Sequence, residues 1–299
     1  MNKAKKKEKT TLGEQIQGIL SHYSDCFKDY EEGAPDTRYK SWEWCHKAFI
    51  ENRIRYRYAD PAEQAKLVDY LALHLAFYLA SWGMYRNSPL LKRDYKVHKN
   101  AVKCILEEKY ELLWDYEPSK DNIPKAKELL FGLRDKENKT SQTNGIYYRI
   151  KRSYPYYKSH GKHASQTLTT KILLGTFGCV PAFDSYLTSG ISNYKSHDGN
   201  CQLGPTIEDD GKTFEALADF AIDHKQELKV DVDFHYPPMK CVDMYFWEIG
   251  YELGLAKALT NSKENEKKKK EVLKRGASLG LYQQNASFEE AARQIKEKN

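Results

Sequence analysis

Asp184 is the first side chain in this sequence whose surroundings suggest chemistry. It is a lone carboxylate between an apolar approach, residues 180–183, and the aromatic Tyr186. A polar turn with a glycine and several cations, residues 159–162, lies upstream. This combination indicates an acid placed against a polyanion. The alternative is that Asp184 caps a helix beginning at Ser185, because aspartate is a preferred N-cap residue, and the two roles can coexist.

A second group of candidate side chains stands at the end of an apolar helix. Asp60 and Pro61 predict the start of this helix, which is apolar nearly all round after Val68 and so is typical of a central, buried helix. An indole, a phenol, a guanidinium group and an amide follow where it ends: Trp82, Tyr85, Arg86 and Asn87. The alternative is that the two rings are ordinary core aromatics and that Arg86 pairs with a carboxylate.

Tyrosines and cations alternate along residues 147–163. Such a segment suits stacking on bases together with contacts to phosphates, and the alternative is a solvated face. His160 and His163 have no third ligand at a useful spacing. Asp231, Asp233 and His235 share one face of an extended segment, but such a run is more typical of a polar strand edge. We therefore expect no metal site.

Composition sets the class of protein. The chain has 299 residues, 22 tyrosines, a formal net charge of +6 and a mean hydropathy of −0.78. It has no apolar run long enough to cross a membrane, and its start, residues 1–10, has lysines without the apolar stretch of a secretory signal. The six cysteines are dispersed and form no C-x-x-C pair, which fits a reducing cytoplasm.

Apolar periodicity predicts an all-α fold. The helices are expected over residues 11–31, 39–57, 60–84, 90–117, 122–136, 213–228 and 239–259, with another that passes through Leu168 and Leu173. Residues 1–10 are expected to form a basic tail and residues 261–275 a charged linker. A helical segment, residues 276–299, closes the chain, and Ser287 with Glu290 forms a capping-box pattern there.

The order of motifs around Asp184 resembles the helix-hairpin-helix DNA glycosylase superfamily. Residues 173–178 are similar to the apolar helix end and turn of that family, and residues 180–187 to the segment that carries its catalytic aspartate. The hairpin falls near residues 161–165. The resemblance implies a two-lobed helical bundle over residues 11–260, with a cleft between the lobes.

Two features depart from the family pattern. The hairpin has one glycine, Gly161, where the family usually has two, so its contact with a phosphate is expected to be altered. Thr167 stands at the position of the Schiff-base lysine of bifunctional members, and Lys171 comes one turn later. The cysteine cluster of the iron–sulfur members is absent. The expected enzyme is therefore monofunctional, without a lyase lysine and without a cofactor.

The resemblance assigns roles to the candidate residues. Asp184 would stabilise the positive sugar that forms as an N-glycosidic bond breaks. A flipped base would enter a pocket formed by Trp82, Tyr85, Arg86, Asn87 and Phe183. The DNA backbone would contact the basic aromatic segment and the hairpin, through Arg149, Lys151, Arg152, Tyr154, Lys158, His160, Gly161, Lys162, His163 and Ser165.

The expected function is a monomeric, cytoplasmic DNA glycosylase that acts on double-stranded DNA and leaves an abasic site. The front half of the chain and the polar loop over residues 188–212 are enlarged, which suggests a modified, bulky base. One specific form is a defence enzyme acting on modified bases of phage DNA. The alternatives are an inactive helix-hairpin-helix module that binds modified or distorted DNA and, more distantly, an RNA-binding helical protein.

Overall fold

The computed structural model describes residues 11–28, 30–34, 37–132, 144–154, 163–192, 203–260, 266–282, 286, 287, 289–291, 293 and 294, with backbone alone for 256–260, 266 and 268. Helices are the main regular structure in these ranges and no strand occurs in them, which confirms the predicted all-α class. The α-helices and short 3₁₀ helices (η) are α1 (Leu12–Lys28), α2 (Lys40–Tyr58), α3 (Pro61–Ser81), η1 (Pro89–Lys92), η2 (Tyr95–His98), α4 (Lys99–Ile105), η3 (Glu108–Leu113), α5 (Ile123–Phe131), α6 (Ile146–Arg152), α8 (Gln166–Thr176), α9 (Ser185–Ile191), α10 (Lys212–Asp223), α11 (Pro238–Thr260) and α12 (Glu266–Ser278).

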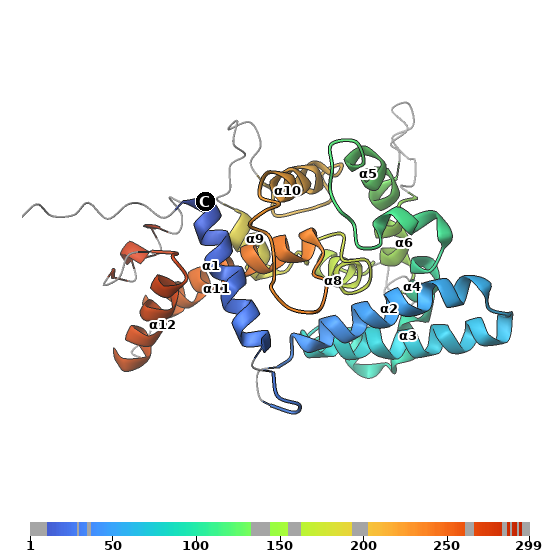
Figure 1. The fold of residues 1–299 in the computed structure, drawn as a ribbon. Helices are drawn as coiled ribbons and strands as arrows, with labels where there is room; N and C mark the ends of the chain where they lie inside the picture. The colour runs from blue at the N-terminus through green and yellow to red at the C-terminus, as the bar shows by residue number, and fades with distance from the viewer. Residues whose placement is uncertain are drawn as a thin grey trace, which may run out of the picture.

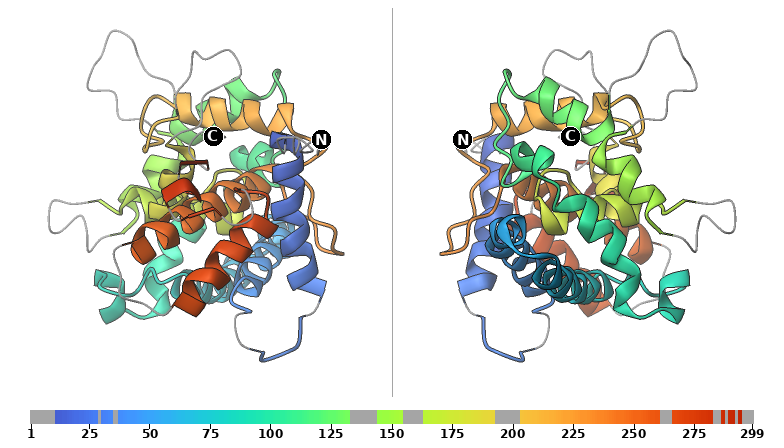
Figure 2. Two further views of the ribbon diagram at one scale, coloured as in Figure 1. Left: turned by 90° about the vertical axis from the view of Figure 1, so that its left-hand side faces the viewer. Right: turned by 90° about the vertical axis from the view of Figure 1, so that its right-hand side faces the viewer.

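Two pairs of helices organise the molecule. α2 and α3 run side by side, and α9 packs against α11 (Figure 1). α8 contacts both α2 and α3, while α1 and α10 pack on α11, with α10 lying across one end (Figure 2). Nearly all of the buried apolar side chains, from Ile16 in α1 to Ala291, form one continuous cluster.

α9 and α11 touch backbone to backbone because each has a glycine at the contact. A Cβ atom on Gly190 would come within 1.9 Å of Phe246 O, and one on Gly250 within 1.8 Å of Tyr186 O. Any other residue at either position would therefore force the two helices apart. This contact sets where α9 begins, and hence where Asp184 lies.

The prediction of a single helix over residues 90–117 is wrong. The chain forms η1, η2, α4 and η3 instead. Short polar side chains form hydrogen bonds with the backbone two residues later. Ser88 Oγ accepts a hydrogen bond from Leu90 N, and Asp94 Oδ1 accepts one from Lys96 N. Tyr110 leaves helical geometry, and Asp115 adopts a positive φ of 47°. Such local bonds compete with the i to i+4 ladder and divide the helix.

The segment expected to form a charged linker, residues 261–275, is helical from Glu266 onward, where α12 begins. Its lysines and glutamates suggested a solvated linker, but they are good helix formers. Leu273 and Ala277 pack against the core, and Leu279 just after the helix is buried. The predicted cap near the C-terminus is confirmed, since Ser287 Oγ accepts a hydrogen bond from Glu290 N.

α3 is less central than its apolar sequence predicts. Tyr70, Leu73 and Phe77 on one of its faces are exposed to solvent. Asp60 caps the helix as expected, its side chain accepting a hydrogen bond from Glu63 N at 2.9 Å. Among the helices that the structure describes, none combines the length and the apolar character needed to cross a membrane.

Candidate functional site

α8 begins and ends at well-defined side-chain contacts. Ser165 caps its start by accepting a hydrogen bond from Leu168 N at 3.1 Å. At its end the carbonyl groups of Leu174 and Thr176 lack partners within the helix. Two side chains of α2 fill that need: Trp42 Nε1 donates to Leu174 O at 2.9 Å, and His46 Nδ1 lies 2.7 Å from Thr176 O. α2 thereby fixes the Phe-Gly turn that follows, in which Gly178 has a φ of 73°.

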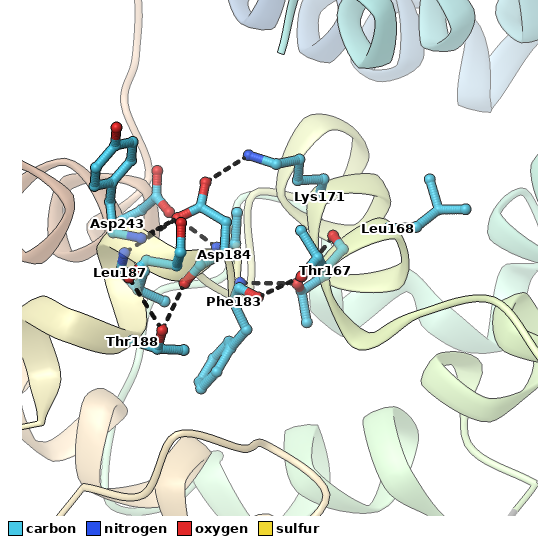
Figure 3. Close-up of polar contacts among 12 residues, drawn as sticks. Thr167, Leu168, Lys171, Phe183, Asp184, Leu187, Thr188 and Asp243 are labelled. Carbon is cyan, nitrogen blue, oxygen red and sulfur yellow. Dashed lines mark hydrogen bonds and ion pairs between the residues drawn. The ribbon is translucent and has the colours of Figure 1, made fainter. Parts of the chain in front are cut away.

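The apolar step from this turn to Asp184 is held between α8 and α11. Thr170 Oγ1 accepts a hydrogen bond from Phe183 N at 2.9 Å, and Thr167 Oγ1 donates to Phe183 O at 2.8 Å (Figure 3). On the other side, Asp243 Oδ1 of α11 accepts a hydrogen bond from Ala182 N at 2.9 Å. The backbone that carries Asp184 is therefore anchored on both flanks.

Asp184 is the N-cap residue of α9. Its Oδ1 accepts hydrogen bonds from Tyr186 N and Leu187 N, both at 3.1 Å. Its Oδ2 points away from the helix and accepts a hydrogen bond from Lys171 Nζ at 2.8 Å (Figure 3). The capping role left open by the sequence is thus confirmed, and one carboxylate oxygen still faces another group. The Asp184 side chain is 16% exposed.

Lys171 was placed away from chemistry by the motif, yet the structure brings it to Asp184. Its side chain is only 6% exposed. Thr167, which the resemblance aligned with a lyase lysine, donates its hydroxyl hydrogen bond to the Phe183 carbonyl. The sequence indicated that Lys171 has some partner, because a lysine inside an apolar helix is rarely buried without one, but it did not identify Asp184 as that partner.

Asp184 and Lys171 line an aromatic pocket with a cavity volume of about 40 Å³. The rings that line it come from α1, α2, α3, the segment before α11, and α11 itself, and they include Tyr23, Trp42, Trp82, Tyr236 and Trp247. Flat rings on several walls suit a flat aromatic ligand, which they would contact by stacking. We call this space the aromatic pocket.

A second ion pair lies in the aromatic pocket, and the sequence had not indicated it. Lys240 Nζ lies 2.9 Å from Asp243 Oδ2, and both side chains are buried. The ammonium of Lys240 lies 5.3 Å from the ring centroid of Trp42, and that of Lys171 lies 5.4 Å from the centroid of Trp82. Both cations are therefore held by a carboxylate and by an aromatic face.

Of the predicted pocket residues, Trp82 lines the aromatic pocket and the others do not. Phe183 is buried in the core, and only its backbone serves the site. Tyr85 turns toward His98, its hydroxyl lying 2.8 Å from His98 Nε2. Arg86 and Asn87 are exposed outside the pocket lining. Gly83 and Asn87 have positive φ angles, so the chain turns away from the pocket directly after Trp82.

The residues predicted to contact DNA differ in their exposure and in their partners. Tyr154 is wrong as a surface contact, because it is 1% exposed and its hydroxyl lies 2.9 Å from His98 Nδ1. Arg149 forms a two-pronged ion pair with Glu107, and Lys151 Nζ lies 2.6 Å from Glu208 Oε1, so both cations have internal partners. Arg152 lines an open polar groove beside α4.

The hairpin region is described only in part. His163 is exposed, and Ser165 is occupied as the cap of α8. Lys158, His160, Gly161 and Lys162 lie outside the described residues. Within the described part of the chain, no three histidine, cysteine or acidic side chains gather as metal ligands. Asp231 instead pairs with Lys28 at 2.7 Å.

Comparison of the chain with protein-family models, with curated proteins and with solved structures found no match in any of the three.

Proposed function

We propose that this protein is a monofunctional DNA glycosylase of the helix-hairpin-helix type, with Asp184 as its catalytic carboxylate. One observation carries the proposal. Asp184 is fixed at the start of α9 by two backbone N–H groups, while its Oδ2 faces Lys171 at the wall of the aromatic pocket. A held carboxylate beside a pocket for a flat ring is what hydrolysis of a base–sugar bond needs.

The proposed reaction begins when a base leaves the DNA stack and enters the aromatic pocket. Stacking on the pocket rings would offset part of the cost of unpairing. As the bond between base and sugar breaks, positive charge develops on the sugar, and the carboxylate of Asp184 stabilises it and orients the attacking water. The backbone anchors from Thr170 and Asp243 keep that carboxylate in place.

Lys171 has a positioning role in this proposal. Its ammonium fixes the direction of Asp184 Oδ2, so the carboxylate is preorganised rather than free to rotate. The substrate in this proposal is DNA with a modified, bulky base, of the kind found in some phage genomes.

Alkali-dependent strand nicking tests the proposal with duplex DNA that carries natural and modified bases. Asp184→Asn keeps the N-cap hydrogen bonds but removes the charge, so release of the base should fall by about 100-fold or more. Asp60→Asn is the matched control, because Asp60 also caps a helix through its side chain but does not line the aromatic pocket. Equal loss in both variants would contradict a catalytic role for Asp184. Nicks that form without alkali would contradict the monofunctional assignment. They would make Lys171 the candidate lyase lysine.

A second candidate function is a DNA-binding module without turnover. One observation favours it: both carboxylate oxygens of Asp184 already have partners, in the α9 backbone and in Lys171. Such a module would bind modified or distorted DNA tightly, and Asp184→Asn would leave that affinity unchanged. No abasic product would form on any substrate, so the same nicking series separates the two functions.

A further inference from the structure

Tyr78 on α3 is a buried polar side chain that the proposed reaction leaves without a task. It is 2% exposed, and it lines the aromatic pocket. Its ring passes directly over Gly175 of α8, where a Cβ atom would come within 2.3 Å of Tyr78 Cε1. Gly175 therefore leaves the room that the ring occupies, one helical turn beyond Lys171 on the same face of α8.

The Tyr78 hydroxyl differs from the other tyrosine hydroxyls of the pocket. It makes no hydrogen bond within the ranges that the structure describes. The hydroxyls of the other three lining tyrosines are engaged: Tyr23 with Glu248, Tyr39 with Cys26 O, and Tyr236 with Glu43. Tyr78 lines the aromatic pocket, so its unengaged hydroxyl is placed where a ligand can accept a hydrogen bond from it.

The surroundings keep this hydroxyl a neutral donor. Burial raises the pKa of Tyr78 well above its usual range, and the nearby carboxylates of Asp243 and Asp184 add to the shift. A protonated hydroxyl can donate a hydrogen bond, so Tyr78 suits a ligand that brings an acceptor.

Resting on the proposed glycosylase function, we infer that the Tyr78 hydroxyl donates a hydrogen bond to the flipped base. The ligand class is a flat heteroaromatic base with a carbonyl oxygen or a ring nitrogen on the edge that enters the pocket. That acceptor gains negative charge as the bond to the sugar breaks, so the hydrogen bond strengthens during the reaction. Tyr78 keeps its proton throughout, and the base is protonated afterwards by water.

Tyr78→Phe tests this inference without disturbing the fold, because the ring over Gly175 remains. Tyr116→Phe is the control: Tyr116 is equally buried, and its hydroxyl donates to Asn122 Oδ1 outside the pocket. Two measurements on the full chain are compared. One is binding of free uracil, cytosine, adenine and hypoxanthine, followed by tryptophan fluorescence, since Trp42, Trp82 and Trp247 line the pocket. The other is release of the base from DNA.

Loss of one hydrogen bond should weaken binding of the preferred base about 5- to 10-fold in Tyr78→Phe and slow its release at least as much. Tyr116→Phe should match the wild type in both measurements. Release that depends on Asp184 but is unchanged in Tyr78→Phe would overturn this inference and leave the proposed function standing. Weaker base binding in Tyr78→Phe, with no release by the wild type, would support the contact and overturn the glycosylase. Binding and release that are both unaffected by the substitution would overturn the inference.

Discussion

At the scale of single residues, Asp184 shows how one side chain serves structure and chemistry together. Its Oδ1 completes the start of α9, and its Oδ2 meets Lys171. The cap was predictable because the pattern that produces it is local. The contact with Lys171 was not, because it depends on where the fold places α8 relative to the residue that precedes α9. The same holds for Lys240 and Asp243, which reach the pocket from a distant part of the sequence.

His46 and Asp115 form a hydrogen-bonded pair that holds the turn after α8. His46 Nε2 lies 2.8 Å from Asp115 Oδ1, and Asp115 N donates to Phe177 O. Burial alone would raise the pKa of Asp115, but the hydrogen bond from His46 and nearby cations outweigh it and hold that pKa below its usual range. This pair contributes stability above about pH 4, which is lost as the pH falls further.

Asp115→Asn should therefore lower the free energy of unfolding at pH 7 by about 1 kcal/mol, a modest value because the carboxylate is one-third exposed and partly screened. Asparagine tolerates the positive φ of this position, so the change removes charge without adding strain. Urea unfolding between pH 7 and pH 3 measures the difference from wild type. That difference should shrink below about pH 4, and a constant difference would contradict the assignment.

At the scale of elements, the contact between α9 and α11 determines the site. The pattern that predicted most helices was reliable where caps were local, as at Asp60 and Asp184. It failed over residues 90–117, where short caps divide the chain, and at Glu266, where charged residues form α12. No sequence signal marked Gly190 and Gly250 as partners, because only the packed structure brings them together.

Gly190→Ala should destabilise the protein by about 3 kcal/mol or more, since the added methyl group would overlap the Phe246 carbonyl. Backbone cannot move aside as a flexible side chain can, so α9 would shift and carry Asp184 with it. Gly254→Ala on α11 is the control, because its Cβ atom would meet nothing closer than Tyr186 Cε1, at 3.4 Å. Thermal unfolding of the two variants makes the comparison, and similar midpoints would contradict the role of the close contact.

At the scale of the whole molecule, charged contacts hold α12 to the core in addition to its apolar contacts through Leu273 and Ala277. Arg275 forms a hydrogen-bonded ion pair with Glu248, which also accepts a hydrogen bond from Tyr23 of the aromatic pocket. Arg275 Nη1 lies 3.0 Å from Glu252 Oε1, yet the geometry makes no hydrogen bond, and both Glu252 oxygens are buried without one in the described chain. Burial, with Glu248 nearby, raises the pKa of Glu252 to about 7 despite Arg275.

A raised carboxyl pKa contributes stability at low pH that is lost as the pH rises, here between about 4.3 and 7. The Glu252→Gln variant has no carboxyl group to ionise at this position, so it does not lose stability in this way as the pH rises. Its free energy of unfolding relative to wild type should therefore increase by about 2 kcal/mol from pH 5 to pH 8. Glu289→Gln, on the exposed surface, should show no such change. Urea unfolding at the two pH values measures both, and an equal effect at pH 5 and pH 8 would count against a buried, protonated Glu252.

The aromatic pocket takes residues from Tyr23 on α1 to Trp247 on α11, and α1 packs against α11. During synthesis, the ribosome releases Asp184 and its neighbours well before it releases α11. A nascent chain that ends before Pro238 has the whole motif around Asp184, but it lacks Lys240, Asp243 and the wall that faces Tyr23. The site is thus completed late, so an unfinished or truncated product holds the carboxylate without a pocket to direct it.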